Sequence, residues 1–420
     1  MPPAKLGTSE LEWLPARVPG HVHLDLLAQG IIADPYVGLG ELGAQWVDEQ
    51  DFSYRLSFDF APDPALPQRV LVFEGLDTVC TLWLNGQRIA EHDNMFLPLE
   101  VNVSGVLRTG ANELRLEFAS ACRVGRERRS CYLKSEGLDD SVVRFDERAF
   151  VRKAQYMFGW DWGPRLVSAG IWRPVKLMEH SGRLIDVRVQ QHHLPDGSVE
   201  VWFESAVEGR GVAVHHLEGH DGLVRDGERV RLLHPRLWWP AGAGVQELYR
   251  VTSWFVPELS RHSTDVDSVA LDRKEQRIGL RTLDLSQQQD RFGQSFEFVV
   301  NGRPLWAVGA NWICDSSFPS VVSRERVRAQ LRRARDVNMN MIRVWGGGLY
   351  ESDDFYDLCD ELGLLVWQDF TYACSYVPDD EAAREVARTE ASFHVRRLRN
   401  HASLALWCGN NENLTMYENR

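Results

Sequence analysis

The stretch MIRVWGGGLYESDDFYDLCDELGLLVWQDF, residues 341–370, decides the fold because the spacing of its apolar residues changes twice. It begins with a short apolar run, MIRVW, which predicts a strand. We then expect a helix that Ser352 opens, with Phe355 and Leu358 on its apolar face and a left-handed Gly363 at its end. The following run LLVW is apolar throughout, which is typical of a parallel strand covered by helices on both sides. The stretch therefore predicts a βαβ unit.

The same alternation of strand and helix continues on both sides of this unit, from about residue 284 to residue 420. Upstream, PLWAVGANWI predicts a strand, and Ser323 is placed to cap the helix that follows it. Downstream, a helical run from about residue 380 to 400 precedes the strand LALWC. In barrels built from such repeats, the active site lies at the carboxyl ends of the strands. Polar or aromatic side chains follow all four predicted strands here, at Asn311-Trp312, Arg343-Trp345, Gln368-Asp369 and Asn410-Asn411-Glu412.

Upstream of residue 284 the apolar residues have the period of strands. The segment DFSYRLSFDF, residues 51–60, alternates strictly, and Asn85-Gly86 separates two apolar runs as in a β-hairpin. Beyond residue 181, Ile185, Val187 and Val189 alternate in the same way. These patterns predict three domains. They are a β-sandwich over residues 1–180, a smaller β-sandwich over residues 181–283, and the strand and helix repeats over residues 284–420.

Composition limits the partners of this 420-residue chain. Its 60 acidic residues outnumber 47 Lys and Arg, and the net charge of −13 disfavours nucleic acid and anionic membranes as partners. Its fifteen tryptophans offer flat apolar faces on which a sugar ring can stack, although core packing is the commoner use of tryptophan. The seven cysteines contain no CxxC pair, so neither a disulfide framework nor a zinc site is indicated. A neutral ligand such as a carbohydrate fits this balance best.

The last predicted strand runs into LALWCGNNEN, residues 404–413, where two amides precede a single carboxylate. Cleavage of a glycosidic bond generally requires two carboxyl groups, one of which protonates the departing oxygen. Glu412 is suited to that role, and Asn410 and Asn411 are suited to bind a sugar hydroxyl beside the reacting carbon. The alternative is that Asn-Asn-Glu only caps the next helix, and the motif by itself does not decide between the two.

Several motifs together resemble glycoside hydrolase family 2, and in particular its β-mannosidase group. LWCGNNEN is similar to the strand that carries the acid/base of that group. The resemblance continues in RVPGHVHLDLLAQGIIADPYVG, RKAQYMFGWDWGPRL, LWWPAGAGVQELY and the βαβ stretch quoted above, in the same order. It implies a jelly-roll sandwich, an immunoglobulin-like sandwich and a (β/α)8 TIM barrel, of which only about the first half is present.

The resemblance implies a retaining exo-glycoside hydrolase that releases terminal β-D-mannose from oligosaccharides or glycoconjugates. The alternatives are a related family 2 exo-glycosidase, such as an exo-β-glucosaminidase, β-glucuronidase or β-galactosidase, or a carbohydrate-binding fragment without catalysis. Glu412 takes the position of the general acid/base. The residues implied in substrate binding are Asn411, Asp161, Trp160, Trp162, Trp345, Arg343 and Asp369.

Residues 160–162 allow a second interpretation. Trp160 and Trp162 can instead fill the core of the first sandwich, and Asp161 then points to the opposite face. A carboxylate buried between two tryptophans is costly unless it has a partner, and this favours a functional role for Asp161.

Two positions near the predicted barrel mouth are also open to a structural interpretation. Asp369 can serve only as the ion-pair partner of Arg343, which would make both residues a scaffold. Trp345 precedes three glycines, which allow a ligand or backbone to approach closely, so we do not expect it in a core.

Family members attack the anomeric carbon with a second glutamate from the seventh barrel strand. Retention requires the two carboxyl groups to lie about 5–5.5 Å apart. Because the predicted barrel strands stop at the fourth, we expect this nucleophile to be absent from the sequence. The sequence is then a fragment of a longer protein, and we expect the fragment by itself to be inactive.

The remaining expectations concern ligands and location. The histidines of the β segments lack the spacing of metal ligands, so no metal and no cofactor are expected. The start MPPAKLGTSELEWLPARVPG has no apolar run typical of a signal peptide, and we expect a cytoplasmic location. The resemblance also implies a further strand before residue 12, so we expect a truncated or misassigned amino terminus. The oligomeric state is not indicated.

Overall fold

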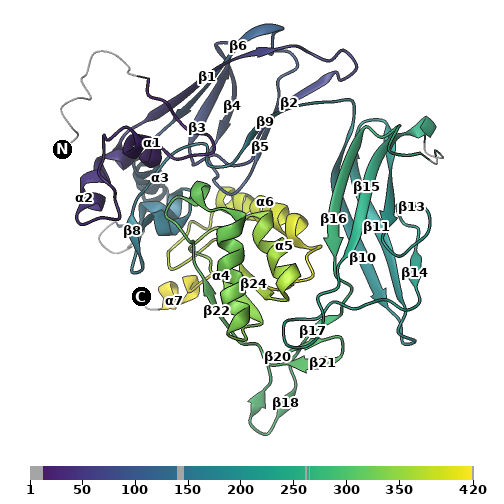
Figure 1. Cartoon of the computed structure of the whole chain (residues 1–420). Helices are drawn as coiled ribbons and strands as arrows, with labels where there is room; N and C mark the ends of the chain where they lie inside the picture. Colours follow the sequence, from purple (N-terminus) through teal and green to yellow (C-terminus); the bar gives the residue numbers. More distant parts are fainter. Residues whose placement is uncertain (1–12, 140–145, 261–262, 264, 419–420) are drawn as a thin grey trace.

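The protein has a multidomain, β-rich fold, shown by a computed structural model that describes residues 13–139, 146–260, 263 and 265–418 (Figure 1). Residues 1–12, which carry part of the expectation about a signal peptide, lie outside the described residues. Among the residues described, none of the helices combines the length and the apolar character needed to cross a membrane.

The first part is a sandwich of two antiparallel sheets. One sheet has the order β1-β6-β3-β4 and the other has the order β5-β2-β9. Leu71 and Phe73 of one sheet share a core with Leu82, Leu114 and Leu116 of the other. The strands are β1 (Phe52–Phe60), β2 (Gln68–Phe73), β3 (Cys80–Leu84), β4 (Gln87–His92), β5 (Leu99–Asn102), β6 (Gly110–Phe118) and β9 (Val175–His180).

The predicted hairpin of this sandwich is confirmed. Asn85 and Gly86 join β3 to β4 with φ angles of 54° and 80°, which this type of tight turn requires at both positions. The first part also contains helices and a short hairpin, β7 (Phe158–Trp160) with β8 (Gly163–Arg165). The helices are α1 (Val22–Ala28), α2 (Gly40–Ala44), η1 (Gln45–Glu49), α3 (Ala121–Ser135), η2 (Glu147–Phe150) and η3 (Gln155–Met157).

The second part is a smaller sandwich whose sheets have the orders β10-β11-β14 and β13-β12-β15-β16. Phe203 on one sheet and Phe255 on the other lie in one buried core. Its elements are β10 (Arg183–His193), β11 (Val199–Glu208), β12 (Gly211–Leu217), β13 (Val224–Arg225), β14 (Val230–Leu232), β15 (Tyr249–Pro257), η4 (Glu258–Ser260) and β16 (Asp272–Ile278).

The third part contains a parallel sheet of four strands in the order β22-β23-β24-β25, with helices between successive strands. The elements of this part are β22 (Gly309–Trp312), η5 (Pro319–Val321), α4 (Arg324–Asp336), β23 (Met341–Val344), α5 (Asp353–Leu362), β24 (Leu365–Asp369), α6 (Glu381–Leu398), β25 (Leu404–Cys408) and α7 (Asn413–Glu418). Short antiparallel strands precede the sheet, namely β17 (Leu283–Ser286), β18 (Gln289–Asp290), β19 (Gly293–Gln294), β20 (Glu297–Val300) and β21 (Arg303–Leu305).

The predicted ends of the helices in this part are largely confirmed. The Ser323 side chain accepts a hydrogen bond from the Arg326 amide at the start of α4, and Gly363 ends α5 with φ at 76°. Ser352 precedes α5 but makes no capping hydrogen bond with its side chain. The strand predicted over PLWAVGANWI is divided into β21 and β22.

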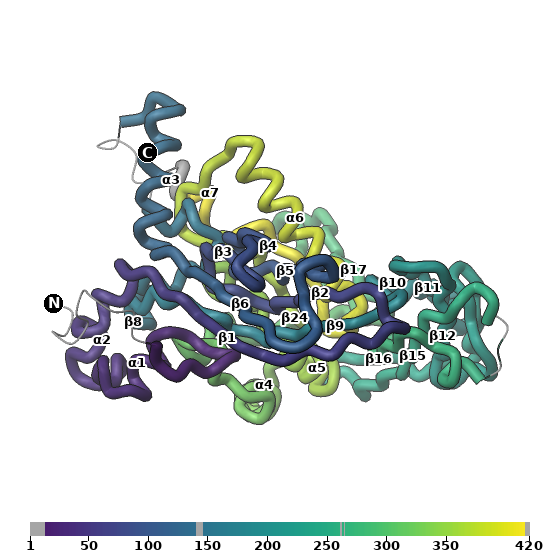
Figure 2. Tube along the Cα trace, turned by 90° about the horizontal axis from the view of Figure 1, so that it is seen from above, coloured from purple at the N-terminus to yellow at the C-terminus, as the bar shows by residue number. Residues whose placement is uncertain are grey.

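Shared cores join the three parts. Tyr156 and Met157 of the first part pack with Leu349 and Tyr350 of the third. Trp238, which precedes β15, packs with core residues of β20, β23 and β24. The first sandwich lies over the parallel sheet when the molecule is viewed from above, and the second sandwich extends to one side (Figure 2). This arrangement places the β7–β8 region beside the third part.

Candidate functional site

The carboxyl ends of the four parallel strands lie at the same end of the sheet. A network of hydrogen bonds centred on Arg343 connects them. The guanidinium of Arg343 donates to both carboxylate oxygens of Asp369, over 3.2 and 2.7 Å. It also donates to the side-chain oxygen of Asn411 over 2.8 Å and lies 3.5 Å from that of Asn311. These polar residues from four different strand ends therefore lie together, which agrees with the position expected for a site on such a sheet.

Asp369 is fully buried within this network. Besides the pair with Arg343, it accepts hydrogen bonds from the Gly346 amide and from the indole of Trp367, each over 3.1 Å. A charge in such surroundings must be paired and hydrogen-bonded, and Asp369 is both. Its contacts are those of a scaffold that fixes Arg343, and Arg343 in turn fixes Asn411.

Asn411 and Glu412 follow the end of β25 and differ in their exposure. Asn411 is 7% exposed, whereas Glu412 is exposed and has φ at 59°. The capping interpretation applies to the neighbouring Asn410, whose side chain accepts from the amide of Asn413 over 3.1 Å. Glu412 instead accepts a hydrogen bond from the thiol of Cys374 over 3.3 Å. The carboxylate is thus available at the surface of the site.

The sequence analysis missed Cys374, which lies in the loop after β24. Its φ angle is 46°, and its thiol also accepts from the Asn411 amide group over 3.2 Å. Burial raises the pKa of this thiol, and the hydrogen bond with Glu412 raises it further. A single cysteine in TYACSYVP gives no signal of this contact, because the two residues meet only when β24 and β25 pair.

Trp345 joins the strand ends to the first sandwich. Its ring lies edge-on to Trp160 with the ring centroids 4.9 Å apart, and to Trp162 at 6.0 Å. The expectation that Trp345 stays out of a core is wrong, because the residue is only 8% exposed. Gly347 serves the tryptophan itself, since a Cβ atom there would lie 1.9 Å from the Trp345 ring, whereas a Cβ atom at Gly346 would lie 2.9 Å from main-chain carbonyl oxygens. The site therefore has an aromatic wall built from two domains.

Asp161 lies in the turn between β7 and β8 and is exposed. The expectation of a buried carboxylate between two tryptophans is wrong, because the two-residue turn carries Asp161 to the surface while both neighbouring indoles contact Trp345. Trp162 is itself 36% exposed. The part that Asp161 plays toward a ligand stays a prediction.

A cavity of about 420 Å³ lies between the β7–β8 hairpin and the loop that carries Cys374. Its lining includes Trp160, Arg148 and Cys374, and its volume falls within the range of roughly 300–1,000 Å³ that is typical of ligand pockets. The Arg148 guanidinium lies 4.8 Å from the centroid of the Trp160 ring and donates to the carbonyl oxygen of Cys374 over 2.9 Å. The cavity therefore adjoins the contact between Cys374 and Glu412.

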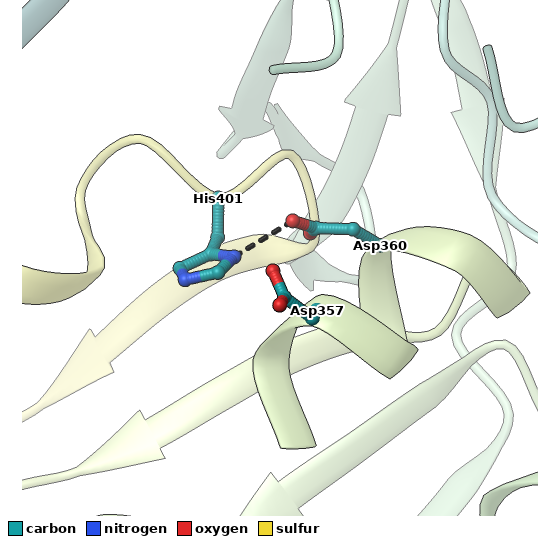
Figure 3. Close-up of side chains that lie close together, drawn as sticks. All are labelled: Asp357, Asp360 and His401. Atoms are coloured by element: carbon teal, nitrogen blue, oxygen red, sulfur yellow. Dashed lines mark hydrogen bonds and ion pairs between the residues drawn. The ribbon is translucent and has the colours of Figure 1, made fainter. Parts of the chain in front are cut away.

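A second cluster, formed by Asp357, Asp360 and His401, has the composition of a metal site (Figure 3). Its potential ligand atoms lie within 4.8 Å of one another. His401 Nδ1 lies 2.7 Å from a carboxylate oxygen of Asp360, whose other oxygen accepts from the Ser403 amide. Burial lowers the pKa of His401, but Asp360 and Asp357 raise it more, so the net shift is upward. The contact between His401 and Asp360 is an ion pair when the imidazole is protonated, whereas only the neutral imidazole could bind a metal.

Comparison with known proteins gives consistent matches. Residues 4–173 match the family described as glycosyl hydrolase 2 galactose-binding domain-like. The chain is 39% identical to "Beta-mannosidase B" of Thermothelomyces thermophilus, and the match covers 96% of this chain and 48% of that protein. It is 38% identical to "Beta-mannosidase B" of Aspergillus fumigatus, where the match covers 98% of this chain and 50% of that protein. The chain thus spans about half the length of these relatives.

Solved structures agree with these matches. The crystal structure of β-D-mannosidase from Dictyoglomus thermophilum superimposes on this one with a TM-score of 0.86, and the two sequences are 39% identical. The match covers 96% of this chain and 51% of that one. An exo-chitosanase of Amycolatopsis orientalis has a TM-score of 0.72 at 19% identity, over 94% of this chain and 45% of that one, and shares the fold alone. Residues 4–173 of this chain are therefore similar to the glycosyl hydrolase 2 galactose-binding domain-like family, and nearly the full length of the chain is similar to proteins named β-mannosidase.

Proposed function

We propose that this chain is part of a retaining exo-glycoside hydrolase that releases terminal non-reducing β-D-mannose from oligosaccharides or glycoconjugates. The observation that carries the proposal is the similarity to proteins named β-mannosidase over 96% of the chain. Those proteins are about twice as long, so the activity is proposed for a polypeptide that contains this chain together with further sequence.

The parallel sheet supports the proposal that β22 to β25 belong to a (β/α)8 barrel. At the free edge of β22, Gly309, Ala310 and Asn311 are exposed, and the nearby Trp306 is 85% exposed. An exposed edge strand presents unpaired main-chain N–H and C=O groups, and native proteins commonly cover or pair such an edge. Further strands would cover this edge, and one of them would supply the carboxylate nucleophile. Amides of β22 should then be protected from hydrogen exchange in the longer polypeptide and exchange faster in the 420-residue chain.

Each residue at the site has a chemical task in this proposal. Glu412 protonates the departing glycosidic oxygen while the nucleophile attacks the anomeric carbon, and it then removes a proton from the water that releases the sugar. Asn411, fixed by Arg343, binds a hydroxyl next to the reacting carbon. Trp345 supplies an apolar wall for the ring together with Trp160 and Trp162, and Asp161 binds more distant hydroxyls.

A panel of p-nitrophenyl glycosides tests the sugar specificity in the longest natural polypeptide that contains this sequence. We expect the β-D-mannoside to be hydrolysed with the highest kcat/KM, and the β-glucoside, β-galactoside, β-glucuronide and β-glucosaminide far more slowly. A preference for one of these other sugars would replace the proposed substrate. The 420-residue chain by itself should hydrolyse none of them, and turnover by it would refute the requirement for a second carboxylate from elsewhere.

Glu412→Gln in the same polypeptide tests the acid role. We expect a loss of about 10²–10⁴ in kcat on mannosides with poor leaving groups, because proton transfer of this kind contributes that much. With dinitrophenyl β-mannoside, whose leaving group needs little protonation, the rate of the glycosylation step should fall much less. Glu381→Gln at the exposed start of α6 is the matched control and should leave both rates unchanged. Equal losses on both substrates would contradict the role.

A further inference from the structure

The loop of residues 371–374 after β24 determines where Glu412 lies. The Asn411 amide donates to the carbonyl oxygen of Tyr372, and the Cys374 amide donates to that of Asn411, each over 2.8 Å. The Cys374 thiol then reaches Glu412. Cys374 and Glu412 both have positive φ angles, 46° and 59°, which are unfavourable for residues other than glycine. Such a pair of conformations persists only where its surroundings hold it in place.

The first sandwich supplies those surroundings. The side-chain oxygen of Gln155 accepts from the Ala373 amide over 2.6 Å, and Arg152 donates to the Thr371 carbonyl oxygen over 3.1 Å. Arg148 donates to the carbonyl oxygen of Cys374. One short segment, residues 148–155, therefore holds main-chain atoms at three positions of the four-residue loop.

Helix α6 fixes this segment in turn. Glu390 is 1% exposed and accepts from Arg152 over 2.6 and 3.0 Å, from the Thr371 hydroxyl over 2.9 Å and from the Asn94 amide group over 3.0 Å. A carboxylate with this many partners holds Arg152 in one geometry. Gln155 and Ala373 are also buried, at 4% and 0% exposure, so water is not available to replace their hydrogen bond.

We infer that Gln155 of the first sandwich is a positioning residue for Glu412 and acts through the loop of residues 371–374. The inference rests on the acid role proposed for Glu412. It gives the first sandwich a part in the proton-transfer step that is separate from any contact with the sugar. Small displacements of a reacting group are costly, since roughly 1 Å can reduce a rate about a hundredfold.

The first test uses the 420-residue chain and needs no enzymatic activity. Gln155→Met keeps the length of the side chain but removes the acceptor for the Ala373 amide. We expect faster alkylation of Cys374 by iodoacetamide at neutral pH, and a lower apparent pKa in the pH profile of the rate, because the thiol loses its contact with Glu412. Glu412→Gln should change the profile in the same direction. Peptide mass spectrometry separates Cys374 from the six other cysteines.

Two variants serve as controls. Gln191→Met removes an acceptor that binds the Arg281 amide over 2.9 Å, away from the loop, and should leave the Cys374 profile unchanged. Gln155→Glu retains an acceptor oxygen and should restore the native profile. A folded Gln155→Met chain with the native alkylation profile would overturn the inference.

If Gln155→Met prevents folding, hydrogen exchange of the native chain decides instead. The amides of Ala373, Cys374 and Asn411 should then exchange together with the main chain of residues 148–155, as one opening unit. Independent exchange of the two groups would overturn the inference.

The second test measures catalysis in the longer polypeptide. Gln155→Met should lower kcat by about tenfold or more on β-mannosides with poor leaving groups, with KM nearly unchanged, and should affect the dinitrophenyl β-mannoside less. Equal effects on both substrates would contradict positioning of the acid. One outcome is that the native polypeptide hydrolyses no β-mannoside while alkylation of Cys374 in Gln155→Met changes as expected. That result would refute the proposed function but would support the link from Gln155 to Glu412 through the loop of residues 371–374.

Discussion

At the scale of single residues, the Trp345 ring leaves no room for a side chain at Gly347. An alanine at Gly347 would place its Cβ atom 1.9 Å from the Trp345 ring, so the indole would have to shift, and this would disturb its contact with Trp160. We expect Gly347→Ala to lower the free energy of unfolding by about 1–3 kcal/mol, as overpacking in cores does, and to change the near-ultraviolet circular dichroism of the tryptophans. Urea unfolding measures the first effect.

Gly105→Ala is the matched control, because no heavy atom lies within 4 Å of the Cβ position there. It should change neither the spectrum nor the stability by more than about 0.5 kcal/mol. Similar losses in the two variants would show that the tryptophan contact is not the cause. Gly347 can be found in the sequence, but its purpose cannot, because it depends on which ring occupies the space that the glycine leaves.

His401 gives a prediction about pH at the same scale. Its folded-state pKa is raised above the ordinary 6.5, so the stabilisation from the pair with Asp360 is complete below about pH 6.5 and is lost as the pH rises through the folded-state value. We expect His401→Gln to be less stable than the native chain at pH 6, with the difference decreasing toward pH 9. Urea unfolding between these values measures it. His216→Gln, which removes an exposed histidine, is the control and is measured at the same pH values.

At the scale of elements, the carboxyl end of α5 combines two effects at one glycine. Gly363 has φ at 76°, and a Cβ atom there would lie 2.5 Å from the Ala241 amide nitrogen. The left-handed conformation alone costs an alanine about 1–2 kcal/mol. We expect Gly363→Ala to lose more stability than Gly137→Ala, whose φ is 63° with no heavy atom within 4 Å. Equal losses in urea unfolding would show that the contact with Ala241 adds nothing.

Helix caps and tight turns are predicted well from the sequence. The caps at Ser323 and Gly363 and the turn at Asn85 agree with the structure because each depends on a few neighbouring residues. The face of β10 is predicted less well. Ile185 is 46% exposed although it alternates with the buried Val187, because a bulge between Leu184 and Asp186 shifts the register. Simple alternation does not reveal a bulge, since the extra residue is defined only by the partner strand.

At the scale of the whole molecule, the strand ends of the candidate site could be predicted and its supports could not. Parallel pairing brings Arg343, Asp369 and Asn411 together, so their proximity follows from the predicted topology. The contact of Arg148 with Cys374 spans 226 residues of sequence. It depends on how the first sandwich docks on the sheet, which no local pattern specifies. The exposure of Asp161 has the same origin, because docking directs both neighbouring tryptophans toward Trp345.

Glu390 is the residue through which this docking is most readily tested. Glu390→Gln removes the charge that pairs with Arg152 and leaves the guanidinium partly buried without its counter-ion. Breaking a buried pair in this way typically costs about 3–5 kcal/mol, and we expect a loss of that size in urea unfolding. On the same helix, the exposed Glu385 pairs with Arg388, and Glu385→Gln should change stability by less than about 0.5 kcal/mol. Equal small losses of stability in the two variants would mean that the shared apolar core holds the domains together. The ion pair would then orient Arg152 without stabilising the fold.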